Sequence, residues 1–336
     1  MSERLETPIE SEFDLPILTK QQRQEMLELE RTGLLPEKIR RNSDLYFKFL
    51  FGRDSRTPLL LDLLNSIFVF LGYPQLKEVT LTHTELVPES FGRKKAIVDI
   101  RAIDENERQL SIELQRESQP EFIPRCLFYW GKNYVQQLGA GRTYKDLKAT
   151  VLISLLCFSL YTEKDNEKSV WDFILTNPQT GRILTEDELL IFVELEKFTE
   201  AMRKLHKEKK GIDHASLTEK ERLLLWGSYI NNVEEGVDLM DNLAREDSVF
   251  KEVQSAEKTY WSAPENRYLQ LQEEIADLDY RTGLLDAEQK GEMRGIGIGM
   301  REKQIQTARK MIARGLSLLD ICDITDLPEN EVRKLM

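Results

Sequence analysis

Two stretches near the start of the chain carry apolar residues at the spacing of one helix face. Along residues 44–51 the apolar positions follow Ser43, a residue type that caps helix N-termini, and Gly52 ends the pattern. Pro58 opens the second stretch, residues 59–68, whose leucines, isoleucine and phenylalanine again fit one helix face. The sequence therefore predicts two consecutive helices.

Patterns typical of strands follow these helices. Apolar and polar positions alternate along residues 79–86, 96–103 and 109–115, which predicts three strands, and a polar turn at residues 104–108 joins the last two. Residues 150–160 form an almost continuous apolar run, as expected of a strand that is buried on both faces.

The remaining pattern sets the fold class. Residues 121–138 form an aromatic-rich helical segment, and the short apolar runs at residues 171–176 and 190–195 predict later strands. This order predicts an α/β fold, with a mixed sheet flanked by helices. After Lys197 the pattern is helical, so we expect an all-helical C-terminal region.

The glycines of the C-terminal half suggest a break in that helical region. Glycines at positions 291, 295, 297 and 299 each cost a helix roughly 1 kcal/mol relative to alanine, so we expect a mobile linker there. A short helix is expected at residues 20–32, within an arm that does not join the core. The expected parts are a polar N-terminal arm (1–42), an α/β domain (43–200), a helical extension (201–287), a Gly-rich linker (288–300) and a small helical tail (301–336).

The tail resembles a small helix-turn-helix between Ala308 and Val332. Ser317 is expected to cap its second helix, whereas Asp326 stands where a glycine often occupies the turn. Two interpretations remain open: the tail contacts DNA or pairs with another protein, or it is a helical hairpin that caps the domain.

Composition and charge limit the classes of function. The 336 residues carry a net charge of −12 and a pI near 5.1, which counts against a protein coated in basic surface but permits a local basic channel. Three widely spaced cysteines indicate a reducing compartment without a disulfide framework. The N-terminus has no signal-peptide pattern, and the longest apolar run is too short to cross a bilayer. We therefore expect a cytoplasmic protein that has no membrane partner.

The candidate chemistry lies on two of the predicted strands. If the turn between them is centred on Asn106, Asp99 lies opposite Glu113, with Cβ atoms about 4.5–5.5 Å apart. Gln115 lies two residues further on and shares that face. The intervening residues point to the opposite face as core: Val98, Ile100, Ile112 and Leu114.

Two carboxylates at this separation repel one another unless a cation lies between them. A hard divalent cation such as Mg²⁺ or Mn²⁺ meets that need, because it takes one or two carboxylates plus waters and leaves room for a phosphate oxygen. Such alternation also arises on any solvated sheet face, so the spacing of Asp99 and Glu113 alone is weak support for a metal site.

A series of short motifs strengthens the case for a metal site at Asp99 and Glu113. In chain order they are DLYFKFLFG (Asp44 to Gly52), LLNSI (Leu63 to Ile67), Lys95-x-x-Val98-Asp99-Ile100, Ile112-Glu113-Leu114-Gln115, and Arg125-x-x-x-Tyr129-Trp130 followed by Tyr134, Gln137, Leu138, Gly141 and Tyr144. The series resembles the Rpn family of recombination-promoting nucleases and transposases, which belong to the PD-(D/E)XK superfamily. The resemblance runs from about Asp44 to the C-terminus.

The resemblance implies a restriction-endonuclease-like fold and roles for several residues. Asp99 and Glu113 would be catalytic metal ligands, and Gln115 would be the catalytic residue at the position where a lysine is usual. Glutamine there is also the habit of that family, so it does not by itself indicate an inactive enzyme. Asp44 matches a family position on the first helix, where it either helps to hold the metal or caps the helix; we favour the cap.

Other residues have two interpretations as well. Lys95, Arg125, Tyr129 and Tyr134 are candidates for contacts with DNA phosphates, because guanidinium and phenol groups suit phosphate oxygens. Aromatic residues at helical spacing more often pack into the core, and Lys95 could be a solvated strand end.

The leading hypothesis is a divalent-metal-dependent DNA endonuclease, connected with recombination or mobile elements, that acts as a monomer or a homodimer. The second is a catalytically weak or inactive nuclease-fold protein that binds DNA or protein, which the acidic charge favours. The third is a helical scaffold for protein partners, carried by residues 200–336.

Overall fold

The computed structural model describes residues 18–82, 85–86, 96–97, 99–139, 141–161, 168–209 and 217–336. The chain divides into two compact units, Met1–Leu271 and Gln272–Met336. Lys95 and Val98, which the sequence places near the candidate chemistry, lie outside the described residues.

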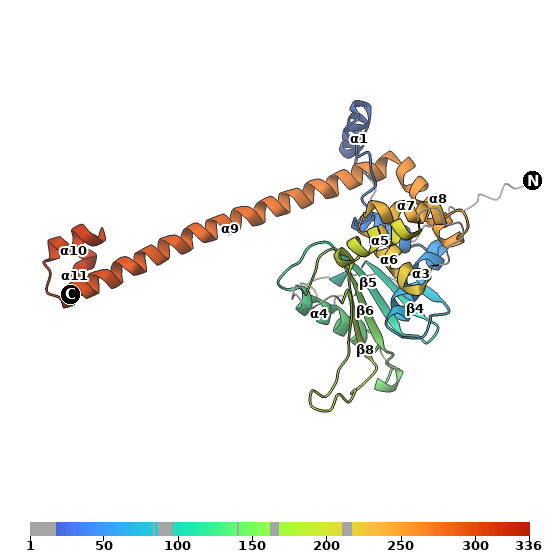
Figure 1. The fold of residues 1–336 in the computed structure, drawn as a ribbon, viewed down its shortest axis with the longest axis horizontal. Coiled ribbons are helices and arrows are strands. Elements are labelled where there is room, and N and C mark those ends of the chain that lie inside the picture. The colour runs from blue at the N-terminus through green and yellow to red at the C-terminus, as the bar shows by residue number, and fades with distance from the viewer. Residues whose placement is uncertain are drawn as a thin grey trace, which may run out of the picture. The chain divides into compact units, whose positions relative to one another are not determined.

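A six-stranded mixed sheet forms the centre of the first unit, as the pattern predicts (Figure 1). Strands β5, β6 and β8 run parallel, and the other neighbours pair antiparallel. Across the sheet the order is β1 (Val79–Thr82), β4 (Ile100–Asp104), β5 (Gln109–Gln115), β6 (Thr150–Leu156), β8 (Glu188–Glu194) and β7 (Val170–Phe173).

The strand predicted for residues 96–103 is divided. Its first part, β3 (Ala96–Ile97), pairs with β2 (Glu85–Leu86) in a separate two-stranded sheet, and the backbone bends at Asp99 before β4 begins. The alternating pattern continues through residue 99 and gives no sign of this bend.

Helices cover both faces of the sheet (Figure 1). One face packs on α2 (Asp44–Phe51) and α3 (Thr57–Phe70), and its core contains Leu60, Ile112 and Ile153. The other face packs on α4 (Phe122–Val135), where Phe122 and Cys126 meet Leu152 and Phe192. Successive residues of β6 therefore enter different cores, which explains why all seven residues of β6 are buried.

A helical layer completes the first core. Trp226 is fully buried, its ring lies against Phe51 and Phe250, and its indole N–H donates to Asp62 at 2.6 Å. The layer consists of α5 (Phe198–Lys209), α6 (Glu219–Ile230), α7 (Glu234–Leu243) and α8 (Ser248–Ser262). Elsewhere in the first unit, short 3₁₀ turns lie at Asp54–Arg56, Tyr144–Asp146 and Leu195–Lys197.

The described part of the expected N-terminal arm, residues 18–42, is not independent of the first unit. Helix α1 (Lys20–Thr32) forms where the pattern predicts it, but Met26 is buried in a cluster with Leu18, Leu35 and Tyr268. The Tyr268 hydroxyl also donates to Glu25 at 2.9 Å. Because Tyr268 lies far away in the sequence, nothing near Met26 indicates that this segment packs against the rest of the unit.

The expected Gly-rich linker at residues 288–300 is helical instead. It lies inside α9 (Pro264–Ala313), a continuous 50-residue helix. Helix propensity sets only a weak preference, which other interactions can override. Within the described ranges, no helix combines the length and the apolar character that a membrane crossing needs.

The second unit ends in a three-helix cluster. Helices α10 (Leu318–Thr325) and α11 (Glu329–Leu335) pack on the end of α9 around Met311, Ile321 and Val332. Ser317 caps α10, as predicted. Asp326 has a φ of 54° and so adopts the left-handed conformation that favours glycine in such turns.

Candidate active site at the ends of strands β4 and β5

The antiparallel pairing of β4 with β5 brings the predicted acidic residues together. Ile100 pairs with Ile112, so the residue before β4, Asp99, lies beside the end of β5, which contains Glu113. The expected core residues of these strands that are described, Ile100, Ile112 and Leu114, are buried in the core. Glu113 has the opposite orientation: its neighbour in β6 is Ser154, on the side of the sheet that α4 covers.

Two groups hold the Asp99 carboxylate. One oxygen, Oδ2, accepts a hydrogen bond from the backbone N–H of Leu114 at 2.9 Å. The other, Oδ1, lies 2.9 Å from Lys48 Nζ on α2. Because Asp99 lies at a bend outside the ladder, its side chain rather than its backbone receives the hydrogen bond from β5. This contact fixes Asp99 relative to the strand that carries Glu113.

Glu113 is a buried carboxyl group in a strongly perturbed environment. It is 7% exposed, and its Oε1 has no hydrogen-bond partner. Burial, and then the nearby charge of Asp99, raise the pKa of Glu113 to about 8, against the opposing effect of Arg125 and Lys48. A carboxyl group held in this way is poised to gain a cation, because a cation would offset both causes of the shift.

Gln115 is held at both ends of its amide group. Its Oε1 accepts a hydrogen bond from the Arg125 guanidinium, and its Nε2 donates to the Glu117 carbonyl at 2.7 Å. Arg125 also donates to Gln119 Oε1 at 2.8 Å. Gln115 carries no charge, but through this hydrogen bond it anchors an arginine whose charge acts on Glu113.

Asp44 does not cap its helix, so the capping interpretation of this residue is wrong. Ser43 is the N-cap of α2, and its hydroxyl accepts from the Tyr46 N–H at 3.0 Å. Asp44 lies in the first turn, where a carboxylate is favoured by the helix dipole, and its Oδ1 is 3.9 Å from Arg116 Nε. Its charge contributes to the raised pKa of Glu113, so it belongs to the surroundings of the site.

Sequence reasoning missed Lys48, although a signal for it exists. Lys48 is the only charged residue between Leu45 and Phe51, within an otherwise apolar and aromatic helix. It also lies four residues after Asp44, which places both on the same side of α2. A pair of carboxylates needs a nearby cation to offset its charge. A lone lysine on an otherwise apolar helix next to the acidic strands can supply that cation.

The other predicted contacts divide between the two ends of the sheet. Tyr129 is half-buried on α4, and burial followed by the charge of Glu113 raises the pKa of its hydroxyl, so it lies near the site. Tyr134 lies elsewhere: its hydroxyl donates to Asp187 at 3.1 Å, and its ring stacks on Trp130, which binds the carbonyl of Thr150 at the opposite end of β6. The structure therefore does not bring Tyr134 to the acidic pair.

The donor set is compatible with a hard divalent cation. Asp99 and Glu113 supply carboxylate oxygens, and Mg²⁺ commonly binds to only one or two carboxylates while water completes its shell. The unpartnered Oε1 of Glu113 is the observation that favours such a ligand. Among the described residues, no group of three or more His, Cys, Asp or Glu side chains could hold a metal ion by itself. Any ion here would therefore depend on water or on a substrate oxygen for further ligands.

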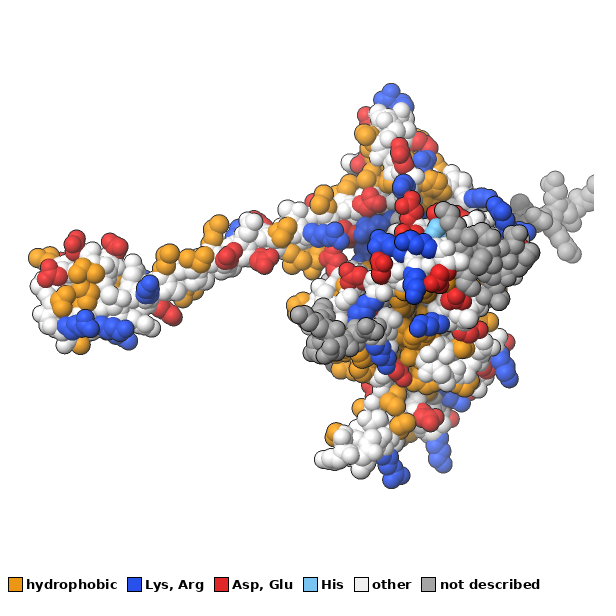
Figure 2. Space-filling model, viewed as in Figure 1, with side chains coloured by type: hydrophobic (Ala, Val, Ile, Leu, Met, Phe, Trp, Pro, Cys, Tyr) orange, Lys and Arg blue, Asp and Glu red, His pale blue; other side chains and the backbone are white. Residues whose placement is uncertain are grey.

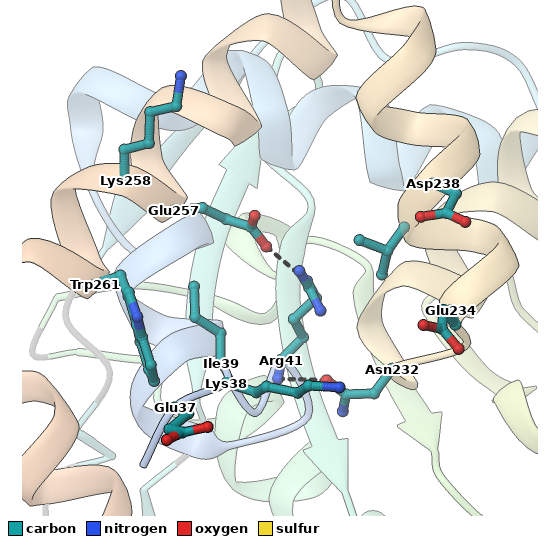
Figure 3. Close-up of a pocket in the computed structure, with 11 residues that line it drawn as sticks. Glu37, Lys38, Ile39, Arg41, Asn232, Glu234, Asp238, Glu257, Lys258 and Trp261 are labelled. Atoms are coloured by element: carbon teal, nitrogen blue, oxygen red, sulfur yellow. Dashed lines mark hydrogen bonds and ion pairs between the residues drawn. The ribbon is translucent and has the colours of Figure 1, made fainter. Parts of the chain in front are cut away.

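A hollow of about 560 Å³ lies in the first unit, and its lining does not include the acidic pair (Figure 3). Arg41 bonds there to Glu257 at 2.6 Å, and Glu257 accepts from Tyr229, whose hydroxyl lies 2.6 Å from that of Tyr46. This polar chain ties the segment before α2 to α6 and α8. Trp261, Lys258, Glu234 and Asp238 form other parts of the wall.

Charge is distributed evenly over the visible face of the molecule. Basic and acidic side chains are interspersed there, without a broad area of one sign (Figure 2). Because attraction for a phosphate chain depends on local charge, the cations beside the acidic pair, Lys48 and Arg125, carry more weight than the overall balance.

Comparison with known protein families finds one family that matches most of the chain. Residues 41–287, nearly three quarters of the chain, match the family described as PD-(D/E)XK nuclease family transposase. No curated protein and no solved structure matches the chain. Nucleases of the PD-(D/E)XK type generally use divalent metals. The matched range covers both the sheet that carries Asp99 and Glu113 and the helical layer behind it, and the chain therefore belongs to the PD-(D/E)XK nuclease family of transposases.

Proposed function

We propose that the chain is a divalent-metal-dependent endonuclease that hydrolyses phosphodiester bonds in DNA. Asp99 and Glu113 are its catalytic carboxylates. The observation that carries the proposal is the buried Glu113 Oε1 without a hydrogen-bond partner, beside a second carboxylate and two cationic side chains. The family's description suggests a role in recombination or in the movement of genetic elements. The cytoplasm is the compartment that the sequence leads us to expect.

Asp99 and Glu113 would hold the metal, Mg²⁺ or Mn²⁺. Such an ion supplies Lewis-acid polarisation of the phosphodiester and lowers the pKa of an attacking water. The hydrogen bond from the Leu114 N–H keeps Asp99 oriented towards the strand of Glu113. Asp44 is close enough for its charge to act on Glu113, which makes it a candidate for an outer ligand through water.

Lys48 and Arg125 would bind and orient the phosphate. Both are cations whose charge acts on Glu113, and both suit phosphate oxygens. Lys48 supplies from α2 the positive charge that Gln115 lacks on β5. Tyr129, half-buried beside them, would add a neutral hydroxyl donor. Lys95 stays a predicted phosphate contact from the sequence alone.

Gln115 would have a positioning role as well as a contact with water. An amide group has two N–H donors, one of which binds the Glu117 carbonyl, and the other would orient the attacking water. Its carbonyl oxygen keeps the Arg125 guanidinium in place. A lysine at this position would repel Arg125, so the glutamine and the arginine suit one another.

A plasmid-nicking assay tests the proposal. The wild-type chain is expected to convert supercoiled DNA to open circles with Mg²⁺ or Mn²⁺, to lose this activity in EDTA, and to cut poorly with Ca²⁺. Asp99→Ala and Glu113→Ala should each lower the rate by about 100-fold or more, because the removal of a metal ligand removes the main electrostatic stabilisation.

Glu186→Ala is the matched control, because Glu186 is an exposed carboxylate just before β8, at the opposite end of the sheet. It should leave the rate unchanged. Circular dichroism of each variant separates loss of activity from loss of fold. Normal cleavage by both site variants would reject the site.

A second function is a catalytically weak or inactive module that keeps the nuclease fold and binds DNA or protein. The net charge of −12 and the ion pair between Lys48 and Asp99 favour it, because that pair already neutralises one carboxylate. Calorimetric titration with Mn²⁺ beside the nicking assay distinguishes the two functions. Metal binding that disappears in Glu113→Ala, together with no nicking by the wild type, would support the inactive module.

A further inference from the structure

Helix α9 carries a row of exposed apolar side chains along the second unit. Six of them follow one another at the spacing of a single helix face, and they are between 44% and 72% exposed. Thr282 and Gln289 occupy the remaining positions of the row. Hydrophobic side chains are visible along this helix in Figure 2. The six are Ile275, Leu278, Leu285, Met293, Ile296 and Met300.

The same part of α9 has little intrinsic support as a helix. Five glycines occur between residues 283 and 299, each costing a helix about 1 kcal/mol relative to alanine. None serves packing within the chain, because a Cβ atom added at any of them would meet no atom within 4 Å. Helical stability in proteins comes mostly from the packing of an apolar face. The exposed row is therefore the face that a partner would cover to stabilise this helix.

The row is symmetric about Gln289. Leu285 and Met293 lie four residues to either side of it, and Leu278 and Met300 lie eleven residues to either side. Thr282 and Ile296, seven residues away, complete the series. Two copies of the helix in antiparallel orientation would match each residue with its mirror position, as a two-fold symmetric interface requires. Gln289 would then meet its own counterpart, and a polar residue within an apolar seam sets the register.

Charge complementarity favours the same arrangement. Residues 272–288 contain six carboxylates and one arginine, whereas residues 289–303 contain four basic and two acidic side chains. An antiparallel pair places the acidic half of each copy beside the basic half of the other, and a parallel pair would place the acidic halves together. In the register centred on Gln289, three oppositely charged pairs flank the seam: Glu274 with Lys303, Asp279 with Arg301, and Asp286 with Lys290.

We propose that this face of α9, from Ile275 to Met300, binds the same face of a second copy of the chain in antiparallel orientation. The interface is about 39 Å long, at 1.5 Å per residue. It rests on α9 alone and is independent of the proposed nuclease activity. The pair joins two nuclease units through one shared two-helix seam.

The oligomeric state of the full chain tests the proposal. Size-exclusion chromatography with light scattering should give twice the chain mass for the wild type, and the single-chain mass for Leu285→Glu and for Ile296→Glu. Leu284→Glu is the matched control, because Leu284 is 51% exposed beside Leu285 at 60% but points away from the row. A monomeric wild type, or equal dissociation by Leu284→Glu, would overturn the proposal.

Cysteine cross-linking tests the orientation. The background is Cys157→Ser with Cys322→Ser, which leaves only the buried Cys126. Leu278→Cys mixed with Met300→Cys should form a covalent dimer on mild oxidation, whereas each variant alone should not. Cross-linking of Leu278→Cys with itself would instead show a parallel pair and contradict the antiparallel seam.

Discussion

Strand β5 and the Ile275–Met300 stretch of helix α9 both repeat apolar positions along one face, but the chain buries only the apolar face of β5. The apolar residues of β5, Leu110, Ile112 and Leu114, are at most 5% exposed. Those of the α9 row are at least 44% exposed. A periodic pattern therefore identifies a face that requires burial. It does not identify the segment or the partner that covers that face.

The glycines of the two regions differ in the same way. In the first unit, a Cβ atom at Gly227 would lie 2.4 Å from the Phe198 ring, so this glycine permits close packing of α6. In α9, a Cβ atom at Gly295 would meet nothing within 4 Å. The first glycine is explained by contacts within the chain, and the second is not.

The largest expected effect concerns the buried carboxyl of β5. The pKa of Glu113 is about 8 in the folded chain, so the native state keeps a proton that the unfolded chain releases above its ordinary pKa of 4.5. Stability should therefore fall as pH rises from about 4.5 to 8, by as much as about 5 kcal/mol. Asp99, Asp44, Lys48 and Arg125 are the charged neighbours that set this pKa.

Urea unfolding in EDTA, followed by tryptophan fluorescence, measures this loss, because all four tryptophans belong to the first unit. Glu113→Gln should remove the pH dependence in that window, whereas Glu292→Gln on the exposed surface of α9 should not. An unchanged slope in Glu113→Gln would contradict the burial of its charge.

The second effect concerns the lysine beside that carboxyl. Lys48→Gln should lower the nicking rate by about 100-fold, equivalent to about 2.7 kcal/mol, because the charge nearest to Asp99 is lost. Lys48→Arg should keep part of the activity. Lys220→Gln, which removes an exposed lysine of α6, is the control and should have no effect. Wild-type rates in Lys48→Gln would leave Lys48 as a structural counterion only.

The third effect returns to the glycine of the first unit. Gly227→Ala should lower the free energy of unfolding by about 1–3 kcal/mol, because the added methyl overlaps the Phe198 ring. Gly227→Ala combined with Phe198→Leu should recover part of the loss. Unaltered urea midpoints in Gly227→Ala would show that α6 can move away from Phe198 at little cost.

The smallest effect has the opposite sign. Gly295→Ala should stabilise α9 by about 0.5–1 kcal/mol, because alanine is the better helix former and the space is open. Hydrogen exchange of the α9 amides measures this as slower exchange. Faster exchange would mean that Gly295 is needed for a close contact, and the contrast between the two glycines would then fail.

Much of the first unit could be predicted because its patterns are local. The helix capped at Ser43, the strand at residues 109–115 and the buried strand that begins at Thr150 all form where the periodicity places them. The period of two also predicts which residues of β4 and β5 point to the core, and Ile100, Ile112 and Leu114 are buried there as expected.

Other features could not be predicted because they depend on contacts between distant segments. The bend at Asp99 is held by a hydrogen bond to Leu114, and nothing near residue 99 in the sequence indicates it. Tyr134 shares α4 with Tyr129, but the length of the helix carries it to the other end of the sheet. Met26 is buried by Tyr268, more than two hundred residues later.

By itself, the sequence determined where the main helices and strands of the first unit form and which of their residues require burial, because both follow from the geometry of a single strand or helix. Only the tertiary structure decided that Lys48 meets Asp99 and that Oε1 of the Glu113 carboxyl is buried without a hydrogen-bond partner. The physical reason is that charge pairing and desolvation depend on how α2 and α4 pack around the end of β5. The distances between side chains of these elements do not follow from the periodicity of any one of them.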